Sequence, residues 1–143
     1  MPVLLDTDHL SVLEWEERPA CDRLLERLDR LPPDDIATSI VSFHEQVQGA
    51  LAYLKRARKA DQVVTAYVKL ETIWRWFLRM NMLSYTGQAQ TRFAALKPRC
   101  PRLKTMDLRI ASIALVTDST LLSRNLRDFR QVPGLAVEHW TIA

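Results

Sequence analysis

Short apolar runs alternate along this chain with longer segments of helical periodicity. The runs at 3–5, 36–38, 82–84, 120–123 and 135–138 have the length and composition of buried strands. Helical patterns occupy 9–17, 20–31, 57–79, 86–96, 107–116, 125–129 and a segment capped by Ser39 or Ser42 that ends near residue 54. Strands that alternate with helices predict a parallel sheet with helices on both faces. We therefore expect a three-layer α/β/α fold with a short parallel sheet of about five strands, one for each run.

The length and composition favour one cytoplasmic domain. A chain of 143 residues has the usual size of a single domain, expected here over 1–143. No apolar run approaches the roughly 20 residues that cross a bilayer, and the start, MPVLLDTD, lacks the basic region of a signal peptide. Cys21 and Cys100 have no metal-binding spacing, so we interpret them as reduced packing residues. We expect no membrane association.

Charge is distributed unevenly along the chain. Residues 14–35 hold eight acids against four arginines, whereas residues 92–109 hold six bases against Asp107 alone. A basic face of this kind suits a polyanionic partner, although a solvated basic surface has the same composition. The residues that could contact such a partner near Asp107 are Arg99, Arg102, Lys104 and, more weakly indicated, Arg127.

Polar side chains follow the expected strands at the points where those strands end. Asp6 comes directly after the first strand, and Asn125 and Asp128 come just after the fourth. Glu45 lies near the start of the helix after the second strand, and Asp107 opens the helix that leads into the fourth. In parallel α/β sheets the functional site lies beyond the carboxyl ends of the strands. We therefore expect these four acids and one amide to meet at one edge of the sheet.

Carboxylates that converge in one pocket repel each other and raise each other's pKa. A divalent cation removes that penalty, and Mg²⁺ and Mn²⁺ prefer such hard oxygen ligands. A cation held there can activate water for attack on phosphorus and stabilise the leaving oxygen. This chemistry suits phosphodiester hydrolysis without a covalent intermediate.

Each acid taken alone has an ordinary structural role open to it. An Asp after a strand is often a helix cap or turn residue, and Asp107 could cap its helix after a proline-rich loop. Asp128 could pair with Arg124 one helical turn earlier. The prediction of a metal site therefore depends on the joint placement of the acids.

Four segments together resemble the motifs of PIN domains, and in particular of the VapC-type toxins of prokaryotic toxin–antitoxin pairs. The segments are LLDTDHLS (4–11), TSIVSFHEQVQGAL (38–51), MDLRIASIAL (106–115) and LLSRNLRDFRQVPGLAVEHW (121–140). Their order and spacing agree with the family over essentially the whole chain. This chain departs from the pattern at Asp8, where many members have Asn, and in the basic segment PRCPRLK before Asp107, which usually contains glycine.

The resemblance implies an endoribonuclease that depends on Mg²⁺ or Mn²⁺ and hydrolyses RNA. It also implies a small antitoxin partner, contact with operator DNA only through that antitoxin, and a homodimer. By position, Asp6, Glu45 and Asp107 would be metal ligands, and all three would be catalytic together with Asn125 and Asp128. Ser123 and Asp8 would not bind the metal themselves but would lie around its ligands, with Ser123 as a hydrogen-bond donor. The basic residues named above would bind RNA phosphates.

Two other functions fit parts of the sequence. LLDTD also matches the opening of haloacid-dehalogenase-like phosphatases, with Asp6 as nucleophile and Asp8 as acid and base. That family has Thr or Val where this chain has Leu10, and its closing pair of acids is missing here. The other alternative is a catalytically inactive PIN-fold module that binds RNA or a protein.

The aromatic and histidine residues allow further expectations. In the long helix over 57–79, we expect Trp74 in the core and Trp76 at an interface. His9 is close to Asp6 in sequence and could contact the pocket. His44 is expected at the surface or behind the metal ligands.

Overall fold

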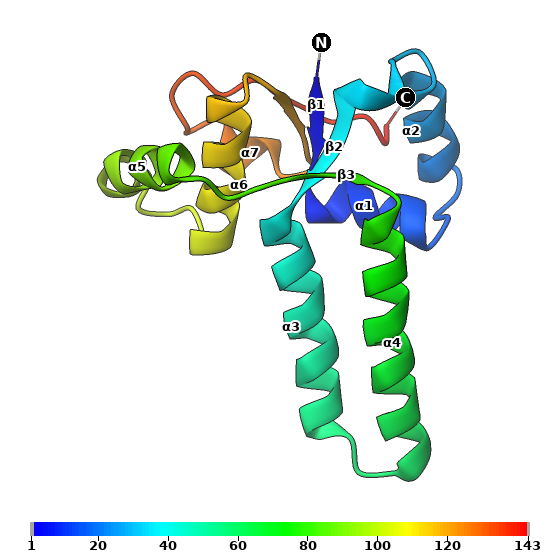
Figure 1. Ribbon diagram of the computed structural model, residues 1–143. Coiled ribbons are helices and arrows are strands. Elements are labelled where there is room, and N and C mark those ends of the chain that lie inside the picture. The colour runs from blue at the N-terminus through cyan, green and yellow to red at the C-terminus, as the bar shows by residue number, and fades with distance from the viewer. Residues whose placement is uncertain (1, 143) are drawn as a thin grey trace.

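The computed structural model describes residues 2–142 and contains a central sheet with helices on both faces (Figure 1). The strands are β1 (Val3–Leu5), β2 (Ile36–Ser39), β3 (Asn81–Leu83), β4 (Thr120–Leu122) and β5 (Val137–Glu138). All of them pair in parallel, in the order β3-β2-β1-β4-β5. The predicted three-layer fold is confirmed. Because β1 is central, the first residue after it lies in the middle of one sheet edge.

The helices correspond to the predicted segments with small shifts at their ends. They are α1 (Thr7–Glu14), α2 (Ala20–Leu28), α3 (Ile40–Arg56), α4 (Ala60–Leu78), α5 (Gly87–Leu96), α6 (Thr105–Val116) and α7 (Leu126–Phe129). Short 3₁₀ helices, η1 (Pro33–Asp35) and η2 (Lys97–Arg99), lie in the connections. The proline-rich segment before Asp107 is therefore not entirely a loop, because Pro98 lies in the first turn of η2, where its missing N–H is not needed.

Helix caps explain two of the observed boundaries. The helix expected over 9–17 begins earlier, at Thr7, because the Asp6 carboxylate accepts a hydrogen bond from the Thr7 N–H at 2.8 Å. Ser39, and not Ser42, caps α3 by accepting from the Ser42 N–H at 3.1 Å. The two caps fix where the chain leaves β1 and β2, and they bring both helix starts to the carboxyl edge of the sheet.

Both faces of the sheet are buried, as continuous apolar strands require. Leu4 and Leu121 pair across β1 and β4 and join a cluster with residues of α5 and α6. Their neighbours Val3, Leu5 and Leu122 point to the other face and join a cluster with residues of α1, α2 and α4. This alternation holds the two central strands rigidly between the two helix layers.

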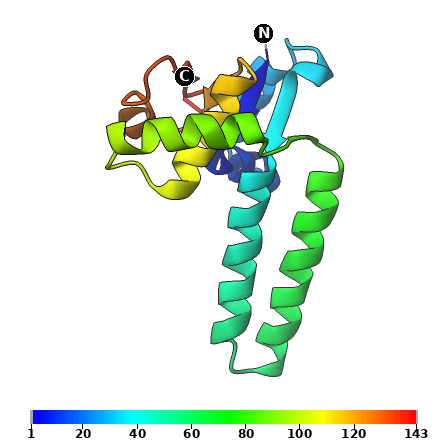
Figure 2. The same cartoon turned by 60° about the vertical axis from the view of Figure 1, so that its left-hand side comes forward.

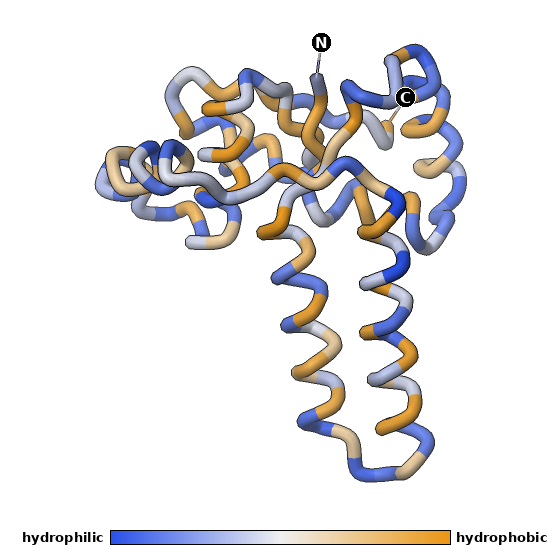
Figure 3. Tube along the Cα trace, in the orientation of Figure 1, coloured by the Kyte–Doolittle hydropathy of each residue, from blue (hydrophilic) through white to orange (hydrophobic). Residues whose placement is uncertain are grey.

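Helices α3 and α4 form an antiparallel hairpin that projects from the sheet in both views (Figures 1 and 2). Apolar and polar residues alternate along both helices (Figure 3). The rings of Phe43 and Phe77 meet edge to face, with centroids 5.2 Å apart. No helix within residues 2–142 is long and apolar enough to span a membrane.

The two tryptophans of α4 differ in burial, and Trp74 is not in the core. Trp74 is 56% exposed, whereas Trp76 is partly buried and packs against the cluster that contains Ile73 and Phe77. The prediction of a core Trp74 was therefore wrong, and an interface role for Trp76 stays a prediction. Apolar residues cover several sides of α4, so their spacing did not identify which side meets the sheet and α3.

We expect the truncation of Phe77 and of Trp74 to have very different effects on the free energy of unfolding. Phe77 is 3% exposed, so Phe77→Ala leaves a cavity and should cost about 3–5 kcal/mol. Trp74→Ala removes a ring that is largely in solvent and should change the stability by only about 0.5 kcal/mol. Urea denaturation of both variants measures this, and equal losses would contradict the observed orientation of α4.

Candidate metal centre

Asp6 lies at the carboxyl end of β1, where the central strands of the sheet end together. Its carboxylate is buried, at 6% exposure for the residue. The Asp6 backbone N–H continues the sheet by donating to the Leu122 carbonyl at 2.9 Å. Ser123, which follows β4, donates from its hydroxyl to Asp6 Oδ2 at 2.7 Å. The parallel pairing of β1 and β4 therefore fixes the position of this carboxylate.

Two further carboxylates reach the same point from helices. Glu45 comes from the second turn of α3, and Asp107 from the first turn of α6. One oxygen each of Asp6, Glu45 and Asp107 lie within 4.8 Å of one another. The three residues are far apart in the sequence, and the meeting of the sheet edge with two helices brings them together.

The three acids fit a divalent cation of the Mg²⁺ or Mn²⁺ type. Their donor atoms are all carboxylate oxygens, the hard ligands that these ions prefer. Oxygens bound to one octahedral Mg²⁺ lie about 3 Å apart when adjacent and about 4 Å apart when opposite. The observed spacing of at most 4.8 Å is wide enough to admit such an ion, and the side chains would close around it. The part of the ion that faces away from the three acids would retain water.

Burial and neighbouring negative charge shift the pKa values of two of these acids, Asp6 and Asp107. Burial, and then the charge of Asp8, raises the pKa of Asp6 from 3.8 to about 7. Burial, and then the charge of Glu45, raises the pKa of Asp107, and the nearby Lys104 ammonium opposes that rise. Both shifts mean that the ionised cluster is unfavourable without a compensating positive charge.

The hydroxyl groups of Thr7 and Ser42, which the sequence did not indicate as part of the site, lie beside Glu45. Thr7 donates from Oγ1 to Glu45 Oε1 at 2.9 Å, and its hydroxyl also lies 3.2 Å from that of Ser42. A weak signal was present, because Thr7 directly follows Asp6 and Ser42 precedes Glu45 by three residues. No local pattern, however, indicates that Thr7 of α1 reaches Glu45 of α3.

Asn125 and Asp128 lie beside the cluster, at the start of α7. The Asn125 amide donates from Nδ2 to Asp128 Oδ2 at 3.0 Å. Asp128 is close enough to Asp107 for its charge to contribute to the raised pKa of that residue. The structure therefore brings Asp128 near the three acids, with one of its oxygens oriented by Asn125.

Asp8 lies next to Ser123 and is held there by contacts within the chain. Its Oδ2 accepts from the Arg124 N–H at 2.9 Å and lies 3.1 Å from the Ser123 hydroxyl, and its Oδ1 lies 2.6 Å from His9 Nδ1. Burial by itself would raise the pKa of Asp8, but the hydrogen bonds, that from His9 first, lower it below 3.8. Asp8 is therefore an ionised carboxylate whose oxygens already have donors from the chain.

The four basic residues singled out for phosphate contact, Arg99, Arg102, Lys104 and Arg127, are all exposed. Lys104 immediately precedes α6 and acts electrostatically on Asp107. Arg99 belongs to η2, Arg102 to the loop after it, and Arg127 to α7.

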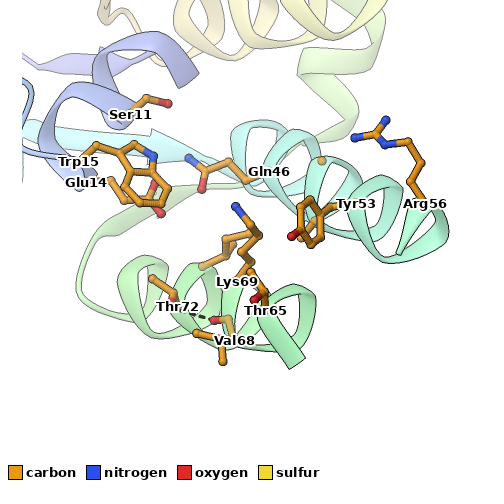
Figure 4. A pocket seen from close by; sticks show the side chains of 13 residues that line it. Ser11, Glu14, Trp15, Gln46, Tyr53, Arg56, Thr65, Val68, Lys69 and Thr72 are labelled. Atoms are coloured by element: carbon orange, nitrogen blue, oxygen red, sulfur yellow. Dashed lines mark hydrogen bonds between the residues drawn. The ribbon is translucent and has the colours of Figure 1, made fainter. Parts of the chain in front are cut away.

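A pocket of about 550 Å³ lies between α1, α3 and α4 (Figure 4). Its lining includes Trp15, Gln46, Tyr53 and Lys69. The Lys69 ammonium lies 5.9 Å from the centroid of the Trp15 ring and 5.2 Å from that of the Tyr53 ring. The lining residues of α3 begin at Gln46, directly after Glu45 in the sequence, and the pocket extends along the hairpin.

Comparison with known proteins gives one family and a set of similar folds. The family model described as the PIN domain matches residues 3–135. Similar solved structures include the VapBC2 complex of Rickettsia felis bound to a promoter DNA fragment (22% identity, 98% of this chain and 99% of that chain, TM-score 0.72). The VapBC-1 complex of nontypeable Haemophilus influenzae is also similar (24% identity, 99% of this chain and 100% of that chain, TM-score 0.75). DNA-bound VapBC of Salmonella typhimurium is similar too (20% identity, 98% of this chain and 98% of that chain, TM-score 0.76). No curated protein sequence matches this chain.

We expect Asp6→Asn to change how the stability of the metal-free protein depends on pH. Because the pKa of Asp6 is about 7 when folded and near 3.8 when unfolded, its stabilising contribution is complete below pH 4 and is lost as the pH rises through 7. Asn keeps the capping function, so the variant should gain on the order of 1–4 kcal/mol over the wild type between pH 5 and pH 8. Urea denaturation in EDTA measures this. A difference that does not change with pH would contradict the raised pKa.

Proposed function

This chain belongs to the PIN domain family, and from that membership we propose that it is an endoribonuclease dependent on Mg²⁺ or Mn²⁺ and the toxin of a toxin–antitoxin pair. The observation that carries the proposal is the convergence of Asp6, Glu45 and Asp107 at the carboxyl edge of the sheet. In this position an acid cluster suits phosphodiester hydrolysis, because a cation held there would activate water and offset charge at phosphorus.

The surrounding residues have distinct parts in the proposed reaction. Asp6, Glu45 and Asp107 would hold the cation. Ser123 and Thr7 orient the first two of these carboxylates through hydrogen bonds of 2.7 and 2.9 Å. Asp128, itself oriented by Asn125, offers a carboxylate beside Asp107 that can accept a hydrogen bond from water. Asp8 would keep Ser123 and the start of α7 in place.

The basic side chains near Asp107 would bind the RNA backbone. Lys104 is exposed and electrostatically coupled to Asp107, so a phosphate bound by its ammonium would lie close to the acids. Arg99, Arg102 and Arg127 are exposed on neighbouring segments and would extend this contact. Positively charged side chains are needed here because the acid cluster alone would repel the negatively charged phosphates of RNA.

The partner in this proposal is a small antitoxin. The similar folds come from VapBC complexes, two of which are bound to DNA. The pocket along α1, α3 and α4 suits an apolar segment of such a partner, and Lys69 suits an acidic residue on it. An occupant of that pocket would cover α1 and α3, the helices that carry Thr7 and Glu45, and could in this way hinder RNA binding. Contact with operator DNA would occur through the antitoxin, and a second copy of this chain would complete the assembly.

The phosphatase alternative gains no support from the site. It requires Asp8 to act as an acid and base toward substrate, whereas Asp8 is held by His9, Ser123 and the Arg124 N–H. The inactive binding module remains the alternative that experiment has to separate from the nuclease.

We expect Asp107→Asn to abolish metal-dependent cleavage of RNA while leaving the protein folded. The substitution removes one of the three carboxylates and keeps the size of the side chain. The measurement is the cleavage of total cellular RNA by purified protein in Mg²⁺, in Mn²⁺ and in EDTA. The wild type should give discrete fragments only with metal, and the variant should show a loss of at least about 100-fold.

Asp118→Asn is the matched control for this experiment. Asp118 is exposed and precedes β4, so it lies at the opposite edge of the sheet, and Asn tolerates its positive φ of 53°. This variant should retain wild-type cleavage. Cleavage that persists in EDTA, or that is equal in the Asp107 variant, would exclude the carboxylate mechanism. No cleavage by folded wild-type protein would favour the binding module.

We expect Lys104→Ala to weaken RNA binding in a way that depends on salt. If Lys104 neutralises one phosphate, its removal should reduce the slope of log affinity against log salt by about 0.7–1. Binding of a labelled single-stranded RNA is measured by fluorescence anisotropy in the non-cleaving Asp107→Asn background. An unchanged slope would show that Lys104 does not contact a phosphate.

A further inference from the structure

His9 is completely buried between the acid cluster and the C-terminal end of the chain, at 0% exposure. Its Nδ1 faces Asp8, and its Nε2 accepts a hydrogen bond from the Trp140 backbone N–H at 3.1 Å. Residues 139–142, which we name the C-terminal strap, follow β5 and lie against α1 at this point. The imidazole therefore joins the strap to the region of the metal centre.

The partner of Nε2 determines the tautomer of His9. A backbone N–H can only donate, so Nε2 must be the unprotonated nitrogen of the ring. The proton is consequently on Nδ1, which donates to Asp8 Oδ1 at 2.6 Å. A distance this short is typical of a hydrogen bond to an ionised carboxylate.

The Ser123 hydroxyl lies between Asp8 and a candidate metal ligand, and the two carboxylates compete for its single proton. Asp8 Oδ2 lies 3.1 Å from the Ser123 hydroxyl, which lies 2.7 Å from Asp6 Oδ2. The Ser123 oxygen in turn accepts from the Asn125 N–H at 3.0 Å. A rotation of the Asp8 carboxylate would therefore change how strongly Asp8 competes for the Ser123 proton and, through it, the orientation of the oxygen that Asp6 presents to the cluster.

We propose that His9 is a positioning residue for the metal centre, which ties the C-terminal strap to Asp6 through Asp8 and Ser123. The inference rests on the proposed function, because it assumes that Asp6 binds a cation. His9 fixes the rotation of the Asp8 carboxylate by its Nδ1–H, and the Trp140 N–H fixes the rotation and the tautomer of His9. Outer hydrogen bonds of this kind orient metal ligands and commonly change metal affinity by about 10- to 100-fold.

The strap has an anchor that does not involve His9. The Trp140 side chain is buried, its ring lies 4.2 Å from the guanidinium carbon of Arg27, and its indole N–H donates to Glu138 at 3.0 Å. Substitution of His9 should therefore leave the strap attached. This separates the positioning role of His9 from a general role in holding the C-terminal end.

Two amide substitutions separate the two hydrogen bonds of His9. In His9→Asn the side-chain nitrogen can take the place of Nδ1 and donate to Asp8, while the acceptor for Trp140 is lost. In His9→Gln the side-chain oxygen can take the place of Nε2 and accept from Trp140, while the donor to Asp8 is lost. Both variants remove a buried ring, so their effects on stability should be similar. His44→Gln, at an exposed histidine next to Glu45, is the control.

The experiment is calorimetric titration of each protein with Mn²⁺ in the absence of RNA, together with urea denaturation in EDTA. We expect His9→Gln to bind Mn²⁺ about tenfold more weakly, and His9→Asn and His44→Gln to stay within about twofold of the wild type. Equal Mn²⁺ affinities of the two His9 variants, or affinities that simply follow the loss of stability, would overturn the inference. A wild type that binds no Mn²⁺ would overturn the metal-dependent function together with it.

Discussion

Repulsion among converging carboxylates is the interaction on which the rest of this structure depends. Asp6, Glu45 and Asp107 present oxygens within 4.8 Å of one another, and burial raises the pKa of Asp6 to about 7. Such a cluster is unfavourable in a metal-free protein and persists because the surrounding fold fixes each acid. A divalent cation would convert the same repulsion into a binding site. The hydroxyls of Ser123 and Thr7 fit that use, because they orient the carboxylates without neutralising them.

The parallel sheet supplies the rigidity that this arrangement needs. Leu4, Leu5, Leu121 and Leu122 are fully buried, so β1 and β4 cannot move apart without exposing both cores. Asp6 and Ser123 follow directly after these two strands and therefore keep their separation. Helices α3 and α6 add their acids from their first two turns, where the helix dipole favours negative charge. Substrate and partner would then contact exposed residues around a centre that does not have to rearrange.

The sheet could be predicted from the sequence, because short apolar runs between helical segments are typical of buried parallel strands. The resemblance also indicated the same three acids that the structure brings together. Prediction failed where the outcome depends on contacts between distant segments. The burial of His9 follows from the packing of the C-terminal strap against α1, the bond from Thr7 to Glu45 from the packing of α1 against α3, and the exposure of Trp74 from the orientation of α4. Local periodicity contains no information about which of several apolar sides becomes the buried one.

The proposed function requires that Asp6, Glu45 and Asp107 bind one cation together. The most direct measurement is anomalous X-ray scattering from a crystal of the protein grown with Mn²⁺. We expect an anomalous peak between the three carboxylates, within bonding distance of an oxygen of each. Mn²⁺ bound only at other acids, or a cluster neutralised by a basic side chain without any ion, would contradict the claim.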